Sequence, residues 1–109
     1  GTPGGATIIT TVAQVIVNAV DFGMTIEDAV AAPRFHHQWL PDRVSFEPGS
    51  LAANLRSRLE ERGHAVEERS EPIGDVQAIG FIGARACGVS DPRGGGAAIG
   101  VDSVYSGRK

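Results

Sequence analysis

The first twenty residues constrain the fold more than any other part of this chain. They join a Pro-Gly-Gly turn at residues 3–5 to a long apolar segment that follows at once. Apolar side chains recur in this segment at intervals of three and four residues, which is typical of a helix. Its β-branched residues favour strands, but burial overrides that weak preference. The pattern predicts a buried helix over residues 8–22, with Gly23 in the left-handed position that ends helices.

The turn at Gly4 and Gly5 has a chemical use as well. The first N–H groups of a helix lack partners inside it, and the helix dipole makes that end partly positive. Because glycine has no side chain, a substrate atom can approach both N–H groups closely, which suits a phosphate, a carboxylate or a developing oxyanion. A structural interpretation competes, in which the turn is only a tight entry into the helix. On the residues alone the structural interpretation is favoured, since short glycine patterns are weak evidence.

Length and composition bound the class of protein. The 109 residues amount to one domain or less, and 41% hydrophobic with 21% charged residues is ordinary for a globular protein. A net charge of −3 without a lysine–arginine cluster argues against nucleic acid as a partner. No apolar run reaches the ~20 residues of a membrane span, and the amino terminus lacks a signal-peptide pattern. A single cysteine, Cys87, excludes an internal disulfide and a multi-cysteine metal site.

Two further helices are predicted. Thr25 and Asp28 form a capping box at the start of a short helix over residues 26–32, which should pack beside the first helix. Ser50 is expected to cap a third helix over residues 51–62, whose charged residues face water. The apolar stripe expected to dock this third helix comprises Leu51, Leu55 and Leu59.

Strand patterns fill much of the remaining chain. Val44 and Phe46 alternate with polar residues, which predicts a half-buried strand. Residues 65–69 predict a short edge strand whose charges oppose unwanted pairing. Residues 76–82 are apolar on both faces, which predicts a strand covered on each side, and residues 84–89 return as its hairpin partner. The sequence therefore predicts an antiparallel sheet.

Several polar residues are candidates for chemistry. His36 and His37 are adjacent, so their side chains point to opposite faces of an extended chain, and no nearby set of ligands completes a metal site. Cys87 is expected to be a small buried hydrophobe, not a nucleophile. Asp91 and Arg93 lie in a loop, where pairing with each other or holding a neighbouring loop is favoured over shaping a substrate site.

Four segments, taken in order, resemble the later part of the small subunit of γ-glutamyltranspeptidases. The resemblance extends over roughly residues 1–96, and no single segment carries it alone. The most specific segment is APRFHHQWLPD at residues 32–42. The others are GTPGG at 1–5 with IITTV at 8–12, VQAI at 76–79 and SDPR at 90–93.

The resemblance implies a fold and a reaction. It implies an α+β fragment, with about three helices and an antiparallel sheet, of the four-layer αββα sandwich of N-terminal-nucleophile hydrolases. In that family a threonine freed by self-cleavage of a precursor is the nucleophile, and its own amine is the base. A γ-glutamyl group passes from glutathione or a related amide to this threonine, and then to water or an acceptor. By position, Gly4 and Gly5 correspond to the glycines that bind the oxyanion, which reverses the preference stated above.

The same resemblance leaves this chain without the attacking group. The family's threonine opens the small subunit well upstream of the turn, and Thr2 and Thr7 do not match it by motif. We therefore expect residues 1–109 to be the C-terminal part of a small subunit, with residues 97–109 as a poorly ordered tail. The expected partners are the large subunit and the upstream part of the same precursor, with no cofactor and no metal. Substrate-binding residues stay unassigned, and only the resemblance suggests a periplasmic or secreted location.

Two alternatives remain open. A related acylase, such as a cephalosporin acylase, shares the architecture and differs in an acyl pocket that this stretch barely samples. A free-standing binding module with an anion site at Gly4 and Gly5 belongs to another class of protein. The module predicts a stable monomer with little exposed apolar surface, whereas an enzyme fragment predicts an open sheet edge or apolar face.

Overall fold

The computed structural model describes residues 1–101, which form three helices and five short strands. The α+β class and the three helices are therefore as the sequence predicts. Among these residues, none of the helices has the length and apolarity to cross a membrane. In chain order the elements are α1 (Thr7–Val20), α2 (Ile26–Ala31), β1 (Phe35–His36), β2 (Val44–Phe46), α3 (Ala53–Glu61), β3 (Val66–Glu68), β4 (Gln77–Ile82) and β5 (Arg85–Ser90).

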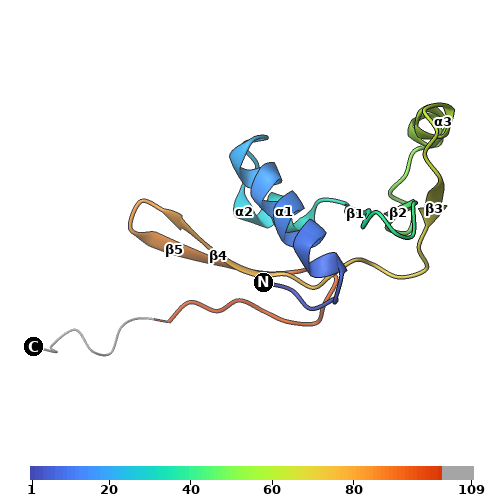
Figure 1. The fold of residues 1–109 in the computed structure, drawn as a ribbon. Helices are drawn as coiled ribbons and strands as arrows, with labels where there is room; N and C mark the ends of the chain where they lie inside the picture. Colours follow the sequence, from blue (N-terminus) through green and yellow to red (C-terminus); the bar gives the residue numbers. More distant parts are fainter. Residues whose placement is uncertain (102–109) are drawn as a thin grey trace, which may run out of the picture.

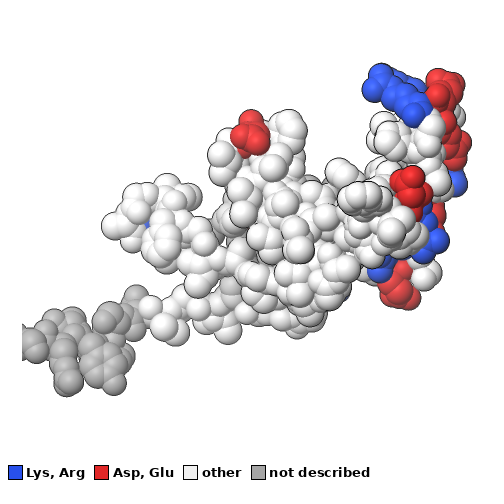
Figure 2. All heavy atoms as spheres, viewed as in Figure 1, with Lys and Arg blue, Asp and Glu red and all other residues white. Residues whose placement is uncertain are grey.

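The molecule is elongated. Its principal extents are 63 × 25 × 22 Å. The radius of gyration is 17.2 Å, where about 13 Å is expected for a compact domain of this length. Figure 1 shows α1 and α2 side by side at the centre, the β4–β5 hairpin projecting on one side, and α3 with β3 at the opposite end. The face seen in Figure 2 carries most of its charges over α3 and β3 and few over α1 and the hairpin.

Helix α1 ends at Val20, two residues before the predicted end. Gly23 has a φ of 65°, and the N–H of Met24 donates to the carbonyl of Asn18, so the left-handed stop is confirmed. The predicted burial of this helix is wrong for the described residues, because α1 contacts only α2 and β1 among the helices and strands. Thr11 and Val15 are buried, whereas large apolar residues on the other faces are exposed: Ile9, Ile16 and Val20.

Helix α2 carries the centre of a small core. Its predicted cap is confirmed, since the N–H of Asp28 donates to Thr25 Oγ1 over 3.1 Å. Ala29 and Val30 are buried, and the helix packs beside α1 as expected. The other buried members of this apolar cluster come from α1, the residue before β4 and the end of β5: Val15, Val76 and Val89.

Helix α3 begins at Ala53, two residues later than predicted. The prediction that Ser50 caps it is wrong, because Ser50 Oγ donates instead to the carbonyl of Glu47, and Ala52 occupies the cap position without a side-chain hydrogen bond. The helix contains no buried residue and contacts only β3 among the helices and strands. Leu55 is 43% exposed while Leu51 and Leu59 are half-buried, so residues 1–101 cover the predicted docking stripe only in part.

The first sheet has the order β1-β2-β3. Strand β1 runs antiparallel to β2, and the edge strand β3 runs parallel to it, with Val44 opposite Val66. The predicted antiparallel pairing therefore holds for β1 with β2 and for β4 with β5, whereas the parallel pairing of β2 with β3 was not predicted. Because the chain between β2 and β3 passes through α3, it crosses over and returns in the same direction. The two residues of β1 are too few to show a sequence pattern.

Strands β4 and β5 form the predicted hairpin, with Ile82 opposite Arg85. The prediction that this segment is covered on both sides is wrong for residues 1–101, since Ile79 and Phe81 are 71% and 72% exposed. Cys87 is exposed as well, contrary to the expected burial. Only the base of the hairpin joins the core, and the rest projects beyond the helices (Figure 1).

The predicted poorly ordered tail, residues 97–109, falls mostly outside the described part of the chain, which ends at residue 101. Residues 97–101 have no helix or strand and run beside the hairpin. A Cβ atom added at Gly88 would lie 3.2 Å from Ala98 Cβ, so this segment passes close to β5.

Candidate functional site

The turn at Gly4 and Gly5 has a backbone that favours glycine. The φ angles are 136° at Gly4 and 58° at Gly5, in the region where residues with a side chain are strained. Both the N–H and the hydroxyl of Thr7 donate to the carbonyl of Gly4, over 3.2 and 2.9 Å. A Cβ atom at Gly4 would collide with Thr7 Oγ1, so the close approach of these two residues requires glycine.

The N–H groups of Gly4 and Gly5 are free within the described residues. Both residues are exposed, and neither N–H donates to an acceptor in residues 1–101. They stand immediately before α1, a 14-residue helix whose first N–H groups and dipole favour negative charge. The geometry therefore suits the binding of an anionic oxygen.

The turn is anchored to the loop before β4. Gly1 and Gln77 exchange two backbone hydrogen bonds of 2.8 Å each. The hydroxyl of Thr2 accepts the N–H of Asp75 over 2.9 Å. Gly74, with a φ of 78°, lies against the same threonine, where an added Cβ atom would be 2.9 Å from Thr2 Oγ1. These contacts fix the chain that enters the Gly4 turn.

A buried ion-pair cluster of Arg34, Glu47, Asp91 and Arg93 lies behind this loop. Arg34 Nη2 is 2.8 Å from Asp91 Oδ2, and both side chains are almost fully buried. Arg93 reaches Asp91 Oδ1 over 3.0 Å and holds Glu47 with two bonds, of 2.6 and 2.7 Å. The expectation that Asp91 and Arg93 pair with each other is confirmed. Two arginines facing two carboxylates balance the buried charge.

The carboxylates of this cluster also hold backbone N–H groups. Glu47 accepts from Arg34 and from Ile73, over 2.7 and 2.9 Å. Asp91 Oδ2 accepts the N–H of Val76 over 2.8 Å. The cluster therefore clamps both ends of the loop from residue 73 to residue 76, which in turn holds Thr2.

The arginines of the cluster donate to carbonyl groups at the end of α2 and in the loop before β4. Arg34 donates to Val30 and Ile73, each over 2.7 Å. Arg93 donates to Val30 and Ala32, over 3.0 and 2.8 Å. These residues thus join α2, β2, the loop before β4 and the segment after β5.

Burial and hydrogen bonding act in opposite directions on the two carboxyl groups of the cluster. Burial opposes ionisation of Glu47, but hydrogen bonds from Arg93 and from the N–H groups of Ile73 and Arg34 outweigh it and lower its pKa. The pKa of Asp91 is lowered in the same way, with burial outweighed by N–H donation and by both arginines. The carboxylates hold the pKa of Arg93 above its usual value, against the effect of burial. All three groups are therefore charged at neutral pH.

The adjacent histidines make separate hydrogen bonds. His36 Nδ1 lies 2.6 Å from Thr10 Oγ1, and the ring is buried. His37 accepts the N–H of Trp39 on Nδ1, so Nε2 carries the proton and faces Asp42 Oδ1 at 3.1 Å. Among residues 1–101 there is no group of three or more His, Cys, Asp or Glu side chains arranged to hold a metal ion.

Sequence reasoning singled out the Gly4 turn, whose role stays a prediction, and two members of the buried cluster, Asp91 and Arg93, but not the other two. The alternation of apolar and polar residues at the predicted strand places Glu47 on its solvent-facing side, and no neighbouring residue indicates that Glu47 is buried. Arg34 was recognised only as part of the APRFHHQWLPD segment. Gln14 was also missed, although its side-chain amide bonds both the N–H and the carbonyl of Phe35, over 3.1 and 2.7 Å, and so fastens β1 to α1.

Comparison with known proteins identifies the family. Residues 1–101 match the family described as Gamma-glutamyltranspeptidase. The chain is 45% identical over 95 residues to the glutathione hydrolase proenzyme of Escherichia coli strain K12, covering 85% of this chain and 16% of that protein. It is 41% identical over 101 residues to the glutathione hydrolase proenzyme of Pseudomonas aeruginosa, covering 91% of this chain and 18% of that protein.

Solved structures of similar proteins support the same family assignment. The γ-glutamyltranspeptidase from Pseudomonas nitroreducens complexed with L-DON superposes with a TM-score of 0.87 at 39% identity, covering 94% of this chain and 54% of that chain. This chain belongs to the γ-glutamyltranspeptidase family. It spans about one sixth of the length of the curated relatives it matches.

Proposed function

We propose that the N–H groups of Gly4 and Gly5 bind the oxyanion formed during γ-glutamyl transfer, within a longer γ-glutamyltranspeptidase. The observation that carries this proposal is the pair of exposed N–H groups before α1, which donate to no acceptor within residues 1–101. Such donors stabilise a transition state because they are in place before the charge develops. Family membership supports the proposal, since the turn lies inside the matched region.

The proposed reaction begins on the γ-carbonyl of glutathione or a related amide. The hydroxyl oxygen of a threonine outside this chain attacks the carbonyl carbon, and its α-amine takes the hydroxyl proton. The carbonyl electron pair moves to the oxygen, where Gly4 and Gly5 donate their hydrogen bonds. The α-ammonium group passes its proton to the leaving nitrogen as this intermediate collapses, so the C–N bond breaks, the amine leaves and a γ-glutamyl ester of the threonine remains. Water or an acceptor amine then attacks the ester and releases the threonine.

The described residues supply oxyanion donors and no N-terminal threonine. Thr2 and Thr7 are both preceded by a residue, so neither has the free α-amine that the mechanism requires. Their hydroxyl groups donate to the carbonyls of Pro3 and Gly4, over 2.8 and 2.9 Å. The activity therefore belongs to the longer protein.

The chain is proposed to form the C-terminal part of a small subunit in a four-layer αββα sandwich, with residues 97–109 as its tail. Its partners are then the upstream part of the same precursor and the large subunit. Exposed apolar side chains support this assignment. Helix α2 covers one face of the hairpin, while Ile79 and Phe81 on the opposite face are exposed where a second sheet would pack. The bare apolar face of α1 has the same explanation.

A free-standing anion-binding module fits these observations less well. Such a module would be compact and would cover its apolar residues, whereas this chain is elongated and exposes large apolar side chains on α1 and on the hairpin. An apolar-sensitive dye should therefore bind strongly to the isolated 109 residues. Dye binding as weak as that of a compact monomer would favour the module.

Two experiments test the enzyme assignment. The isolated 109 residues are expected not to hydrolyse a γ-glutamyl anilide, because the covalent route needs the missing nucleophile. Turnover above that of a mock-purified control would contradict the proposal. In the full-length protein, glutathione should be a far better substrate than a glutaryl amide. A preference for the glutaryl amide would assign the protein to the related acylases instead.

A further inference from the structure

The open edge of β4 continues a strand pairing that starts at Gly1. The N–H of Gly1 donates to the carbonyl of Gln77, and the N–H of Gln77 donates to the carbonyl of Gly1, both over 2.8 Å. Two residues that exchange both hydrogen bonds are the hydrogen-bonded pair of an antiparallel ladder. Figure 1 shows the N-terminus at the base of the hairpin, beside β4. After this pair, the side-chain hydroxyl of Thr2 accepts the N–H of Asp75, which holds the chain against the loop before β4 but is not a ladder hydrogen bond.

The direction of this pairing fixes where a preceding segment runs. Gly1 lies opposite Gln77 in this antiparallel pairing. If the pairing continues, the residue directly before Gly1 lies opposite Ala78, and the residue before that lies opposite Ile79. Backbone groups alternate along a strand, so Gln77, Ile79 and Phe81 direct their N–H and C=O groups to this edge. The intervening residues of β4 direct theirs to β5, as Val76 does toward Asp91.

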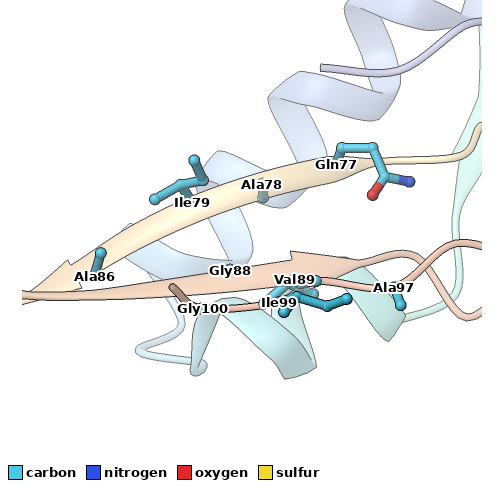
Figure 3. Close-up of a pocket in the computed structure, with 10 residues that line it drawn as sticks. Gln77, Ala78, Ile79, Ala86, Gly88, Val89, Ala97, Ile99 and Gly100 are labelled. Carbon is cyan, nitrogen blue, oxygen red and sulfur yellow. The ribbon is translucent and has the colours of Figure 1, made fainter. Parts of the chain in front are cut away.

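The edge lacks a partner beyond Gln77 in the described residues. The N–H and C=O groups of Ile79 and Phe81 make no backbone hydrogen bond to any segment in residues 1–101. Their side chains are 71% and 72% exposed. Ile79 also lines a groove of about 520 Å³ between the hairpin and residues 97–100 (Figure 3). An unpaired apolar edge of this kind is a template for another strand.

We propose that the segment immediately preceding Gly1 in the full-length protein pairs with this edge of β4. That segment forms a third strand antiparallel to β4, so the sheet order becomes preceding strand, β4, β5. The existing pair of Gly1 and Gln77 identifies this segment as the partner of the edge. A chain that is joined to the nitrogen of Gly1 and keeps the same register passes directly beside Ala78 and Ile79.

This strand would position the Gly4 turn from its N-terminal side. The chain would leave a three-stranded sheet at Gly1, pass Thr2 and Pro3, and enter α1 through the two glycines. The turn would then be held between a sheet strand and a helix, which are rigid elements. The pairing of this strand with β4 is a property of the fold and does not depend on whether Gly4 and Gly5 bind an oxyanion.

A disulfide trap in the full-length protein tests the register. In a Cys87→Ser background, a cysteine replaces the residue directly before Gly1, and Ala78→Cys provides its partner. Non-hydrogen-bonded antiparallel pairs bring Cα atoms to about 4.5 Å, within the range that a disulfide accepts. We expect an intramolecular disulfide under mild oxidation, identified as a linked peptide by mass spectrometry. The matched control carries Phe81→Cys in place of the cysteine at residue 78. Phe81 lies three residues further along β4, so the two cysteines of this control should remain reduced.

Hydrogen exchange in the full-length wild type gives an independent measurement. The amides of Ile79 and Phe81 should be as protected as those of Ala78 and Gly80, which bond to β5. Faster exchange at Ile79 and Phe81 alone would show an open edge and overturn the proposal. Protection without the Ala78→Cys cross-link would assign the edge to a different segment, and an intermolecular disulfide would assign it to a second copy. Either result would also overturn it.

Discussion

The guanidinium of Arg93 grips the carboxylate of Glu47 with two parallel hydrogen bonds, Nη2 to Oε1 over 2.6 Å and Nε to Oε2 over 2.7 Å. The two residues are 46 positions apart in the sequence, and both side chains are nearly buried. This contact joins β2 to the segment after β5, and through the N–H of Ile73 it reaches the loop that anchors Thr2. The buried cluster therefore supports the geometry of the Gly4 turn from behind.

Removing one partner of this contact should be strongly destabilising. Arg93→Met leaves the charge of Glu47 buried without its main partner, and breaking such a pair costs about 3–5 kcal/mol. Arg93→Lys keeps the charge but loses the planar fork, so we expect an intermediate loss. The melting temperature of the full-length protein measures both effects.

The matched control for Arg93 is Arg43→Met, which breaks the half-exposed pair of Arg43 and Glu67. Exposed pairs contribute about 0–1 kcal/mol, so its melting temperature should hardly change. Equal losses in the Arg93 and Arg43 variants would show that the buried cluster has no special role in stability.

The lowered pKa values of Glu47 and Asp91 predict acid sensitivity. Their folded-state pKa values lie below the ordinary values of 4.5 and 3.8, so in acid the unfolded state binds more protons than the folded state. The stability that these groups contribute is complete above their ordinary pKa values and is lost as the pH falls below those values through the lowered folded-state pKa values. Melting temperatures measured from neutral pH into acid should show this decrease.

The variant Glu47→Gln tests the assignment of that decrease. Glutamine does not titrate, so this variant should melt lower at neutral pH but lose less on acidification than the wild type. A decrease of the same steepness in both proteins would mean that the acid sensitivity arises from other carboxyl groups.

Gly74 offers a test of close packing beside Thr2. Gly74→Ala introduces a Cβ atom 2.9 Å from Thr2 Oγ1 and 3.1 Å from Thr11 Cγ2, at a φ of 78°. Gly49→Ala has a similar backbone, with a φ of 68°, but its Cβ atom meets nothing within 4 Å. Both variants bear the left-handed strain, so the extra loss at Gly74, expected to be about 1–3 kcal/mol, measures the crowding. Equal melting temperatures would show that the contact relaxes freely.

Local signals predicted the helices and the hairpin well. The Thr25 cap, the Gly23 stop and the hairpin of residues 76–89 depend on neighbours in sequence, so the chain itself contains the information. The wrong cap at Ser50 shows the limit of such signals, because α3 begins only at Ala53 and the Ser50 hydroxyl, three residues earlier, donates to the carbonyl of Glu47.

Contacts between distant residues could not be predicted in this way. The burial of Glu47 requires Arg93 and Ile73, which lie 46 and 26 positions away. The parallel pairing of β2 and β3 depends on the path of the chain through α3. The predicted burial of α1 and of β4 failed because an apolar pattern indicates that a face can be covered, but not whether residues 1–101 supply the cover.

If the N–H groups of Gly4 and Gly5 bind the oxyanion, as we propose, the variant Gly5→Val should lose turnover in the full-length protein. Gly23→Val is the matched control at the other end of α1, since Gly5 and Gly23 have φ angles of 58° and 65° and an added Cβ atom meets nothing within 4 Å at either. We expect Gly5→Val to lower kcat for a γ-glutamyl anilide by about 100-fold or more with little change in KM. Gly23→Val should leave both constants near the wild type. Near-wild-type kcat in Gly5→Val, or equal losses in the two folded variants, would contradict the claim.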